Sequence, residues 1–244
     1  MRKVYYLDND FKLELNESSD ITLVINSSLI NIDYKLKDGE YNILVFNNSN
    51  CDSTIKEKGD IINSTCNITY LELNDFKYIQ DNSLNVYRDS SLNINTIYLG
   101  INTKNITFNM FNLEGNSIAT ITNNVVCLDD TDFSLNIIGN IVKGAKNSKC
   151  HQKSQCLTFG IPKKAKVLPV LNIDENDVEA SHSLSSGTID EEVLFYMNAR
   201  GLDNKDALSL ILTSYLMPGE EFYKRFIDGL KIKEIAFKKV EKIC

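Results

Sequence analysis

Apolar and polar residues alternate in many short runs through roughly the first two thirds of the chain. Clear runs occupy residues 21–26, 30–36, 106–110 and 133–137. A period of two predicts a strand with one buried face. The runs recur about every 10–12 residues, and Asn, Asp, Ser and Gly, which tolerate turn geometry, separate them. Because no helical stripe interrupts these runs, a sheet built from alternating strands and helices is not expected.

Regularly spaced strands fit a β-sandwich, a β-barrel or a β-solenoid. Asparagine is abundant before residue 150 and scarce after it. Asparagine at the corners favours a solenoid, because each coil needs residues in left-handed conformations to change direction. A plain sandwich in a chain of biased composition remains the alternative, so the pattern alone leaves the topology open.

The hydrophobic period changes to a helical one after residue 187. Thr188 and Glu191 have the spacing of a capping box, and the predicted helix that follows stops at Gly201. Asp203 can cap a second helix. The second helix carries one apolar stripe, formed by Ala207, Leu208, Ile211, Leu212, Tyr215 and Leu216.

Two more helical segments are predicted towards the C-terminus. Pro218 and Gly219 break the second helix and begin a third, whose apolar residues are Phe222, Phe226 and Ile227. A fourth segment places Ile232, Ile235, Ala236, Val240 and Ile243 on one side, and its lysines are interpreted as a solvated face. The chain therefore divides into a mainly β part, residues 1–187, and a helical part, residues 188–244.

Charge and composition exclude several classes of function. The 244 residues carry a net charge of −7 with a pI of about 5.0, which argues against a general nucleic-acid binder. No apolar run approaches the roughly 20 residues of a membrane-spanning helix, and the first residues lack the apolar stretch of a signal peptide. We therefore expect a cytoplasmic protein without a membrane partner. The six cysteines form no CxxC pair, so a zinc ribbon is not expected.

Standard catalytic signatures are lacking, and two places offer candidate chemistry. Cys150 follows Lys149 and precedes His151, so its pKa could be lowered and its thiolate could attack sulfur or bind a soft metal. Cys156 would share a strand face with Cys150, since their separation is even. The alternative is that both cysteines are small buried residues. His182 is either a hydrogen-bonded structural histidine or a neutral imidazole ligand for iron.

One stretch resembles a known family. Residues 190–207, DEEVLFYMNARGLDNKDA, closely resemble the C-terminal signature of the SufB/SufD family, which runs roughly DEExLFYLxSRGxxxxxA. KNSKCHQKSQCLTFG, residues 146–160, is similar to a stretch of SufB proteins, and Pro169 matches a family proline before His182. The resemblance covers residues 133–217 well.

The resemblance implies a right-handed parallel β-helix core and a C-terminal helical domain that binds a SufC-type ABC ATPase. The helical residues taken for ATPase docking are Glu191, Glu192, Phe195, Tyr196, Arg200 and Asp206. Family members dimerise through their β-helices, so a homodimer or a heterodimer with a SufB/SufD paralogue is expected. Strands begin near residue 20, so we expect a reduced-length member without the family's N-terminal helical region.

The resemblance also implies iron–sulfur cluster assembly, with a cysteine desulfurase or sulfur carrier as donor and a transient iron–sulfur cluster on the assembled complex. Cys150 falls on a cysteine that SufB-type scaffolds use for sulfur or cluster binding, and His182 falls on the interface histidine. Cys156 is a further candidate. Ala180 replaces a SufD cysteine and Ser183 replaces a SufB glutamate.

Three functions are compatible with this mixture of SufB-like and SufD-like residues. The first is a non-enzymatic scaffold whose partner hydrolyses ATP. The second is a SufD-like structural partner of a separate SufB scaffold, without a cluster site of its own. The third, more remote, is a carbohydrate-binding β-solenoid, suggested by several N-x-S/T triplets.

Overall fold

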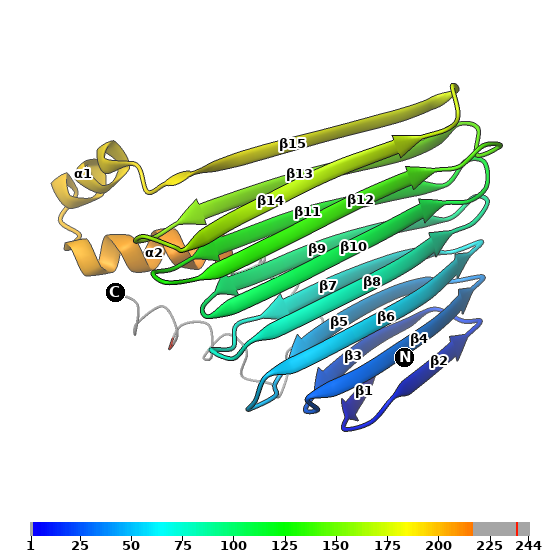
Figure 1. Cartoon of the computed structure of the whole chain (residues 1–244), viewed down its shortest axis with the longest axis horizontal. Helices are drawn as coiled ribbons and strands as arrows, with labels where there is room; N and C mark the ends of the chain where they lie inside the picture. The colour runs from blue at the N-terminus through cyan, green and yellow to red at the C-terminus, as the bar shows by residue number, and fades with distance from the viewer. Residues whose placement is uncertain (1, 217–237, 239–244) are drawn as a thin grey trace.

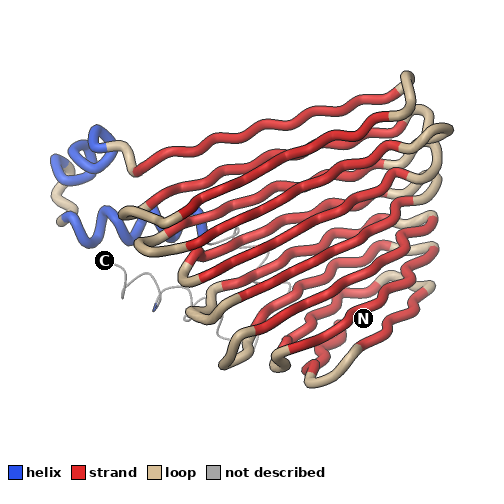
Figure 2. The backbone as a smooth tube through the Cα atoms, in the orientation of Figure 1, coloured by secondary structure: helices blue, strands red, loops and turns tan. Residues whose placement is uncertain are grey.

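The computed structural model describes residues 2–216 and residue 238, and its described part is a parallel β-solenoid followed by two helices (Figures 1 and 2). The strands are β1 (Arg2–Leu7), β2 (Phe11–Leu15), β3 (Ser19–Ile25), β4 (Leu29–Lys37), β5 (Glu40–Asn47), β6 (Ser53–Ile62), β7 (Thr65–Glu72), β8 (Tyr78–Val86), β9 (Ser91–Gly100), β10 (Thr103–Asn112), β11 (Ile118–Cys127), β12 (Asp132–Ile141), β13 (Ser148–Thr158), β14 (Lys164–Ile173) and β15 (Val178–Thr188). The helices are α1 (Glu191–Ala199) and α2 (Asn204–Leu216).

Consecutive strands lie in opposite sheets. The odd-numbered strands form an eight-stranded sheet, here sheet A, and the even-numbered strands form a seven-stranded sheet, here sheet B. Neighbours within each sheet pair in parallel, as β11 does with β9 and β13. A parallel neighbour normally needs a long crossover, and here the intervening strand of the other sheet serves as that crossover. The expected solenoid is confirmed, and the sandwich and barrel alternatives are wrong.

The core lies between the two sheets and follows the period-two pattern. Strand β12 alternates strictly between buried and half-buried residues, and its inward side chains Phe133, Leu135 and Ile137 are completely buried. The four alternating runs predicted from the sequence fall within β3, β4, β10 and β12, except that Asn26 lies just beyond the end of β3. Removal of this apolar surface from water is the main favourable term for such a coil.

Left-handed residues make the corners between sheet B and sheet A. Positive φ angles occur at Asp38, Asn63, Asp89, Asn116 and Asn147, each in the turn that follows an even-numbered strand. Their side chains stack along the coil: Asn63 Nδ2 donates to Asp38 Oδ1 at 2.7 Å, and Asn116 Nδ2 donates to Asp89 Oδ1 at 2.9 Å. Short Asn and Asp side chains tolerate this conformation.

A second polar ladder runs across the outer face of sheet A. Asn42, Asn67 and Asn93 occupy aligned positions on β5, β7 and β9. Each amide donates to the side chain on the preceding strand of the sheet, starting with Asn42 to Asp20, at 2.9–3.0 Å. Asparagine therefore serves both the corners and the flat face, which explains its abundance in the β part.

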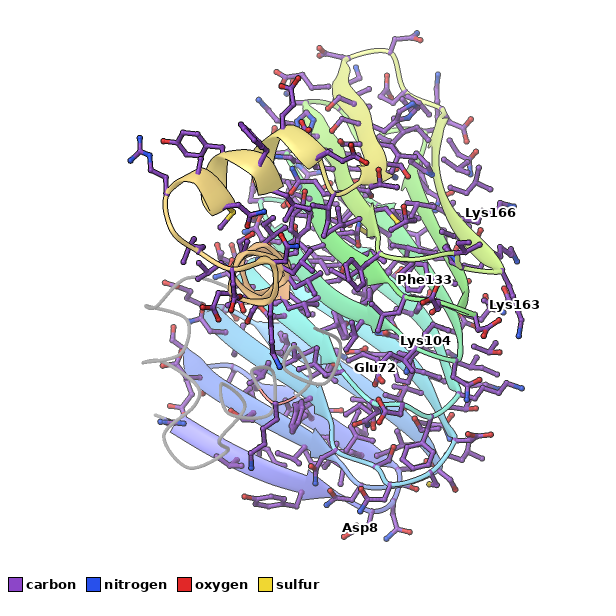
Figure 3. All side chains as sticks on the ribbon, turned by 90° about the vertical axis from the view of Figure 1, so that its left-hand side faces the viewer. Asp8, Glu72, Lys104, Phe133, Lys163 and Lys166 are labelled. Atoms are coloured by element: carbon purple, nitrogen blue, oxygen red, sulfur yellow. The ribbon has the colours of Figure 1, made fainter. Side chains whose placement is uncertain are left out.

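One buried ion pair closes the turn between β7 and β8. Lys104 Nζ lies 2.8 Å from Glu72 Oε1, and neither side chain is exposed by more than 1%. The same ammonium donates to the carbonyl oxygens of Asn74 and Phe76 at 2.7 and 2.9 Å. Figure 3 shows Glu72 and Lys104 inside the coil, whereas Lys163 and Lys166 project outward. Paired and hydrogen-bonded in this way, the two charges can be buried.

The two helices follow the last strand directly. Asp190, rather than Thr188, is the N-cap of α1, because its Oδ1 accepts the Glu192 N–H at 2.8 Å while Thr188 still belongs to β15. The predicted stop is confirmed by Gly201, with φ of +94°. The predicted cap Asp203 is also confirmed, since its Oδ1 accepts the Asp206 N–H at 2.7 Å.

Helix α2 packs on the outer face of sheet A. Leu212 and Leu216 are fully buried in a cluster with Val126 of β11 and Leu157 of β13, and Ile211 and Tyr215 pack at its margin. The predicted stripe of α2 is therefore the face that contacts the sheet. None of the described helices is long and apolar enough to span a membrane.

The predicted third and fourth helices fall almost entirely outside the described residues. The division after residue 187 also remains a prediction, although the change from β15 to α1 occurs between Thr188 and Glu191.

Candidate functional site

Cys150 lies inside the last coils, on the inward face of β13. Its side chain is completely buried, and burial raises the pKa of the thiol to about 12. The packing is close, because a Cβ atom at Gly139 of β12 would collide with the Cys150 sulfur. Glycine at this position therefore makes room for the thiol.

The predicted lowering of the Cys150 pKa is wrong. Lys149 and His151 flank Cys150 in sequence but lie on the opposite face of β13, because successive side chains of a strand alternate. On that outer face Lys149 Nζ lies 3.0 Å from Glu179 Oε1, and His151 Nδ1 is hydrogen-bonded to the Ser181 hydroxyl at 2.8 Å. Neither cation-capable side chain stabilises the Cys150 thiolate.

His182 lies on the neighbouring strand β15, one same-face position beyond Ala180, the residue in register with Cys150. Its side chain is exposed. The structure thus places Cys150 and His182 at adjacent positions of the β13–β15 pair. The Cys150 thiol is buried, whereas the His182 imidazole is exposed. Of the two interpretations offered for Cys150, a reactive thiolate and a small buried residue, the structure agrees with the buried residue.

Gln152 is a neighbour of both Cys150 and His182. It is in register with His182, and its Nε2 donates to the Val170 carbonyl of β14 at 3.0 Å. Its Oε1 is buried and has no hydrogen-bond partner among the described residues. This amide therefore ties sheet A to sheet B beside His182 and leaves one acceptor free, a feature that the sequence analysis missed.

Cys156 shares the inward face of β13 with Cys150, as the even spacing predicted. Cys127 of β11 lies on the same inward face, diagonally across from Cys156, because Cys156 is in register with Val125. Cys127 was missed because its proximity depends on the register between coils. The only local signal was its position two residues after the inward Val125.

The coil ends in two edge strands. Within the described residues, β14 pairs only with β12, and β15 pairs only with β13. Leu168 of β14 and Leu184 of β15 are more than 40% exposed. Unpaired edges with exposed apolar residues invite pairing with another chain. We call β14 and β15 together the terminal edge.

Helix α1 directly follows β15 of the terminal edge (Figure 1), and none of its residues is buried. Phe195 is 75% exposed and Tyr196 is 58% exposed, while the Arg200 guanidinium lies 4.9 Å from the Tyr196 ring centre. The six residues predicted for ATPase docking are all exposed: Glu191, Glu192, Phe195, Tyr196, Arg200 and Asp206. An aromatic and charged helix face of this kind is typical of a protein interface.

The described residues contain no group of three or more His, Cys, Asp and Glu side chains arranged to hold a metal ion. A cluster bound here would need ligands from a second chain, from the remainder of this chain or from the sulfur itself.

Together these features define a parallel β-solenoid with an open terminal edge and exposed helices. Residues 37–215 match the family model described as "SUF system FeS cluster assembly, SufBD core domain". The chain therefore belongs to the SufB/SufD family.

Several curated proteins are similar. The iron–sulfur cluster assembly protein SufD of Bacillus subtilis is 30% identical over 149 residues, which are 60% of this chain and 34% of that protein. SufD of Escherichia coli is 29% identical over 97 residues, 40% of this chain and 22% of that protein. A SufBD family protein of Pyrococcus horikoshii is 34% identical over 80 residues, 33% of this chain and 18% of that protein. The matches thus span about a third or less of these relatives.

Proposed function

We propose that this chain is a non-enzymatic scaffold component of iron–sulfur cluster assembly in the cytoplasm, working with a SufC-type ABC ATPase. The observation that carries the proposal is the family match over residues 37–215, which includes the coil from β5 onward, the terminal edge and both helices up to Tyr215. The names of the matched relatives point to the same process.

The proposed cluster-binding or sulfur-binding groups are Cys150 and His182, with Cys156 as a further thiol. The terminal edge pairs with a second copy or with a SufB/SufD paralogue, and a cysteine desulfurase or sulfur carrier supplies sulfur. Soft thiolate and imidazole ligands suit iron in such a cluster. Burial of Cys150 requires the terminal coil to open before this thiol can act, since the protonated, sealed form is unreactive.

The ATPase docks on the exposed face of α1 and α2. Only Ile189 and Asp190 separate β15 from α1, so a displacement of the helices pulls directly on the strand that carries His182. An ATPase that binds two arrangements of the helices with different affinity would shift the terminal coil between closed and open states.

Anaerobic reconstitution of the full chain with the cognate ATPase tests the site. Wild-type protein should retain iron and sulfide after gel filtration, and Cys150→Ala should retain much less. The exposed Cys51→Ala serves as the matched control, since Cys51 lies far from the terminal edge in the turn between β5 and β6. Undiminished loading of Cys150→Ala would remove Cys150 from the proposed site.

Docking is tested with the full-length double variant Phe195→Ala/Tyr196→Ala. ATPase binding should weaken by about tenfold or more, as for loss of central aromatic contacts. Tyr6→Ala removes a similarly exposed aromatic ring from β1 at the other end of the coil and should leave binding unchanged. Equal binding by both variants would contradict the docking site.

A SufD-like structural role is the second candidate. It is favoured by the sealed Cys150 thiol and by Ala180 and Ser183, which supply no ligand beside His182. Reconstitution in which iron and sulfide remain with a separate SufB scaffold, and never with this chain, would favour it.

A further inference from the structure

One buried acceptor inside the terminal coil lacks a partner among the described residues. The Gln152 side chain is only 2% exposed, and its Oε1 makes no hydrogen bond there. The orientation of this amide is fixed, because Nε2 donates to the Val170 carbonyl of β14 at 3.0 Å. A flipped amide would place its oxygen against that carbonyl oxygen, and neither atom could donate. Oε1 is therefore an acceptor whose burial is unfavourable until a donor reaches it.

The fold makes room for this amide. A Cβ atom at Gly139 of β12 would lie 2.9 Å from Gln152 Nε2, and it would also collide with the Cys150 sulfur. Glycine at this position therefore allows a long polar side chain to cross the coil from sheet A to sheet B. Because β14 holds its nitrogen, the amide keeps Oε1 at a fixed place in the terminal coil.

Three side chains next to Gln152 on the inward face carry a hydrogen-bond donor: Cys150, Ser154 and His182. Cys150 and Ser154 are buried, and neither donates to Oε1. His182 of β15 is in register with Gln152, and paired strands lie about 4.8 Å apart. Its side chain is exposed, so the imidazole can turn without disturbing the packed core. His182 is therefore the donor that can reach this acceptor.

We propose that Gln152 is a positioning residue for His182, because its Oε1 accepts one imidazole N–H and holds the ring in one orientation at the terminal edge. A neutral imidazole carries a single N–H, so this hydrogen bond leaves the other ring nitrogen without a proton. The unprotonated nitrogen is the one that can bind iron. The inference deepens the proposed function, in which His182 is an iron ligand, and rests on it for its biological meaning.

A partner of this kind is common at metal sites. A histidine that binds a metal usually donates its other N–H to a protein acceptor, which fixes the orientation of the ring and the position of its proton. Gln152 reaches the ring from inside the coil. The exposed side of the imidazole therefore stays free for the cargo and for a partner chain.

NMR spectroscopy of the full chain with isotope-labelled histidine tests the hydrogen bond without iron or ATPase. The chain has only two histidines, so His151→Asn and His182→Asn assign both rings. In wild type, one ring N–H of His182 should exchange with water about tenfold or more slowly relative to Gln152→Met, which removes the acceptor at similar side-chain length.

Two controls separate the acceptor from general effects on the coil. Gln155→Met makes the same replacement on the outer face of β13 and should leave the exchange of the His182 N–H unchanged. The His151 ring, hydrogen-bonded to Ser181 on that outer face, should exchange equally in wild type and in Gln152→Met.

Gln152→Glu separates the acceptor from the link to β14. Its carboxylate keeps an acceptor but lacks the N–H that donates to the Val170 carbonyl. Slow exchange of the His182 N–H should therefore persist in this variant. Fast exchange in Gln152→Glu would show that the link to β14, rather than the acceptor, holds the ring, and would overturn the proposal.

The proposal is also overturned if the His182 N–H of wild type exchanges as fast as that of free histidine, a result that needs no variant to fold. The role towards iron is tested in the reconstitution described above, where Gln152→Met should retain about tenfold less iron and sulfide. Full retention by Gln152→Met together with loss in His182→Ala would overturn the positioning role. Full retention by His182→Ala would instead remove His182 from the proposed function, whatever the exchange measurement shows.

Discussion

Buried ionisable side chains couple the stability of the coil to pH. Glu57 points inward from β6 and is 1% exposed. Burial raises its pKa to about 8 from 4.5, and the Tyr70 hydroxyl only partly opposes this shift. The folded state therefore holds a proton on Glu57 that the unfolded state has lost at neutral pH.

The sign of the pH effect follows from this difference. Between about pH 4.5 and pH 8 the folded state binds more protons at Glu57, so this residue lowers the free energy of unfolding as pH rises. Glu57→Gln should remove this loss and stabilise the protein by about 3 kcal/mol at pH 7, with a smaller gain at pH 5. Urea unfolding at several pH values measures the free energy of unfolding of the wild type and of Glu57→Gln.

Glu17→Gln, at an exposed position, is the control and should change stability little at any of these pH values. A Glu57→Gln variant that is less stable than wild type at pH 8 would show that Glu57 is ionised and held by a partner in the fold.

Residue-level chemistry at the candidate site could be predicted only in part. The even spacing of Cys150 and Cys156 correctly placed both thiols on one face. The effect of Lys149 and His151 was predicted wrongly because neighbours in sequence point to opposite sides of a strand. Cys127 and Gln152 could not be found, since their neighbours come from other strands, 18 residues away for the Val170 carbonyl beside Gln152, and nothing local fixes that register.

At the scale of elements, the corners hold the coil in register. Asn116 has φ of 58° in the turn between β10 and β11, and its side chain donates to Asp89 and accepts from Asn147. Turn residues and period-two runs are local signals, which is why the strands were predictable from sequence. The cap of α1 was misassigned to Thr188 because β15 continues through that residue and only pairing with β13 shows it.

Asn116→Val should destabilise the protein by about 2 kcal/mol. A β-branched residue is disfavoured in the left-handed region, and the substitution also breaks two side-chain hydrogen bonds. Chemical denaturation gives the difference in the free energy of unfolding. Asn105→Val, on the exposed face of β10, should change stability by less than about 0.5 kcal/mol, and equal effects of both substitutions would contradict the role of the corner.

At the scale of the whole molecule, the terminal edge and the helices lie at the same end of the chain (Figure 1). This end of the coil thus carries the edge strands β14 and β15, the candidate thiols and the aromatic face of α1. This arrangement suits a protein that works within an assembly, because partners at the edge and on the helices would both act on β15.

Leu184→Lys tests the pairing of the terminal edge. A charge on β15 should raise the dissociation constant of a dimer by about tenfold or more, because charged residues on natural edge strands oppose pairing with another chain. Analytical ultracentrifugation measures the effect, with Tyr6→Lys on β1 as the control at the other end. A wild-type chain that stays monomeric at every concentration contradicts the homodimer, and the paralogue must then be supplied.

The most direct test of the account is hydrogen–deuterium exchange of the full chain with the cognate ATPase, with and without ATP. We predict slower exchange in residues 191–200 on ATPase binding, and a nucleotide-dependent change in residues 148–188, with residues 2–25 unaffected. ATPase binding that leaves exchange in residues 148–188 the same with and without ATP would contradict the claim that the helices transmit motion to the terminal coil.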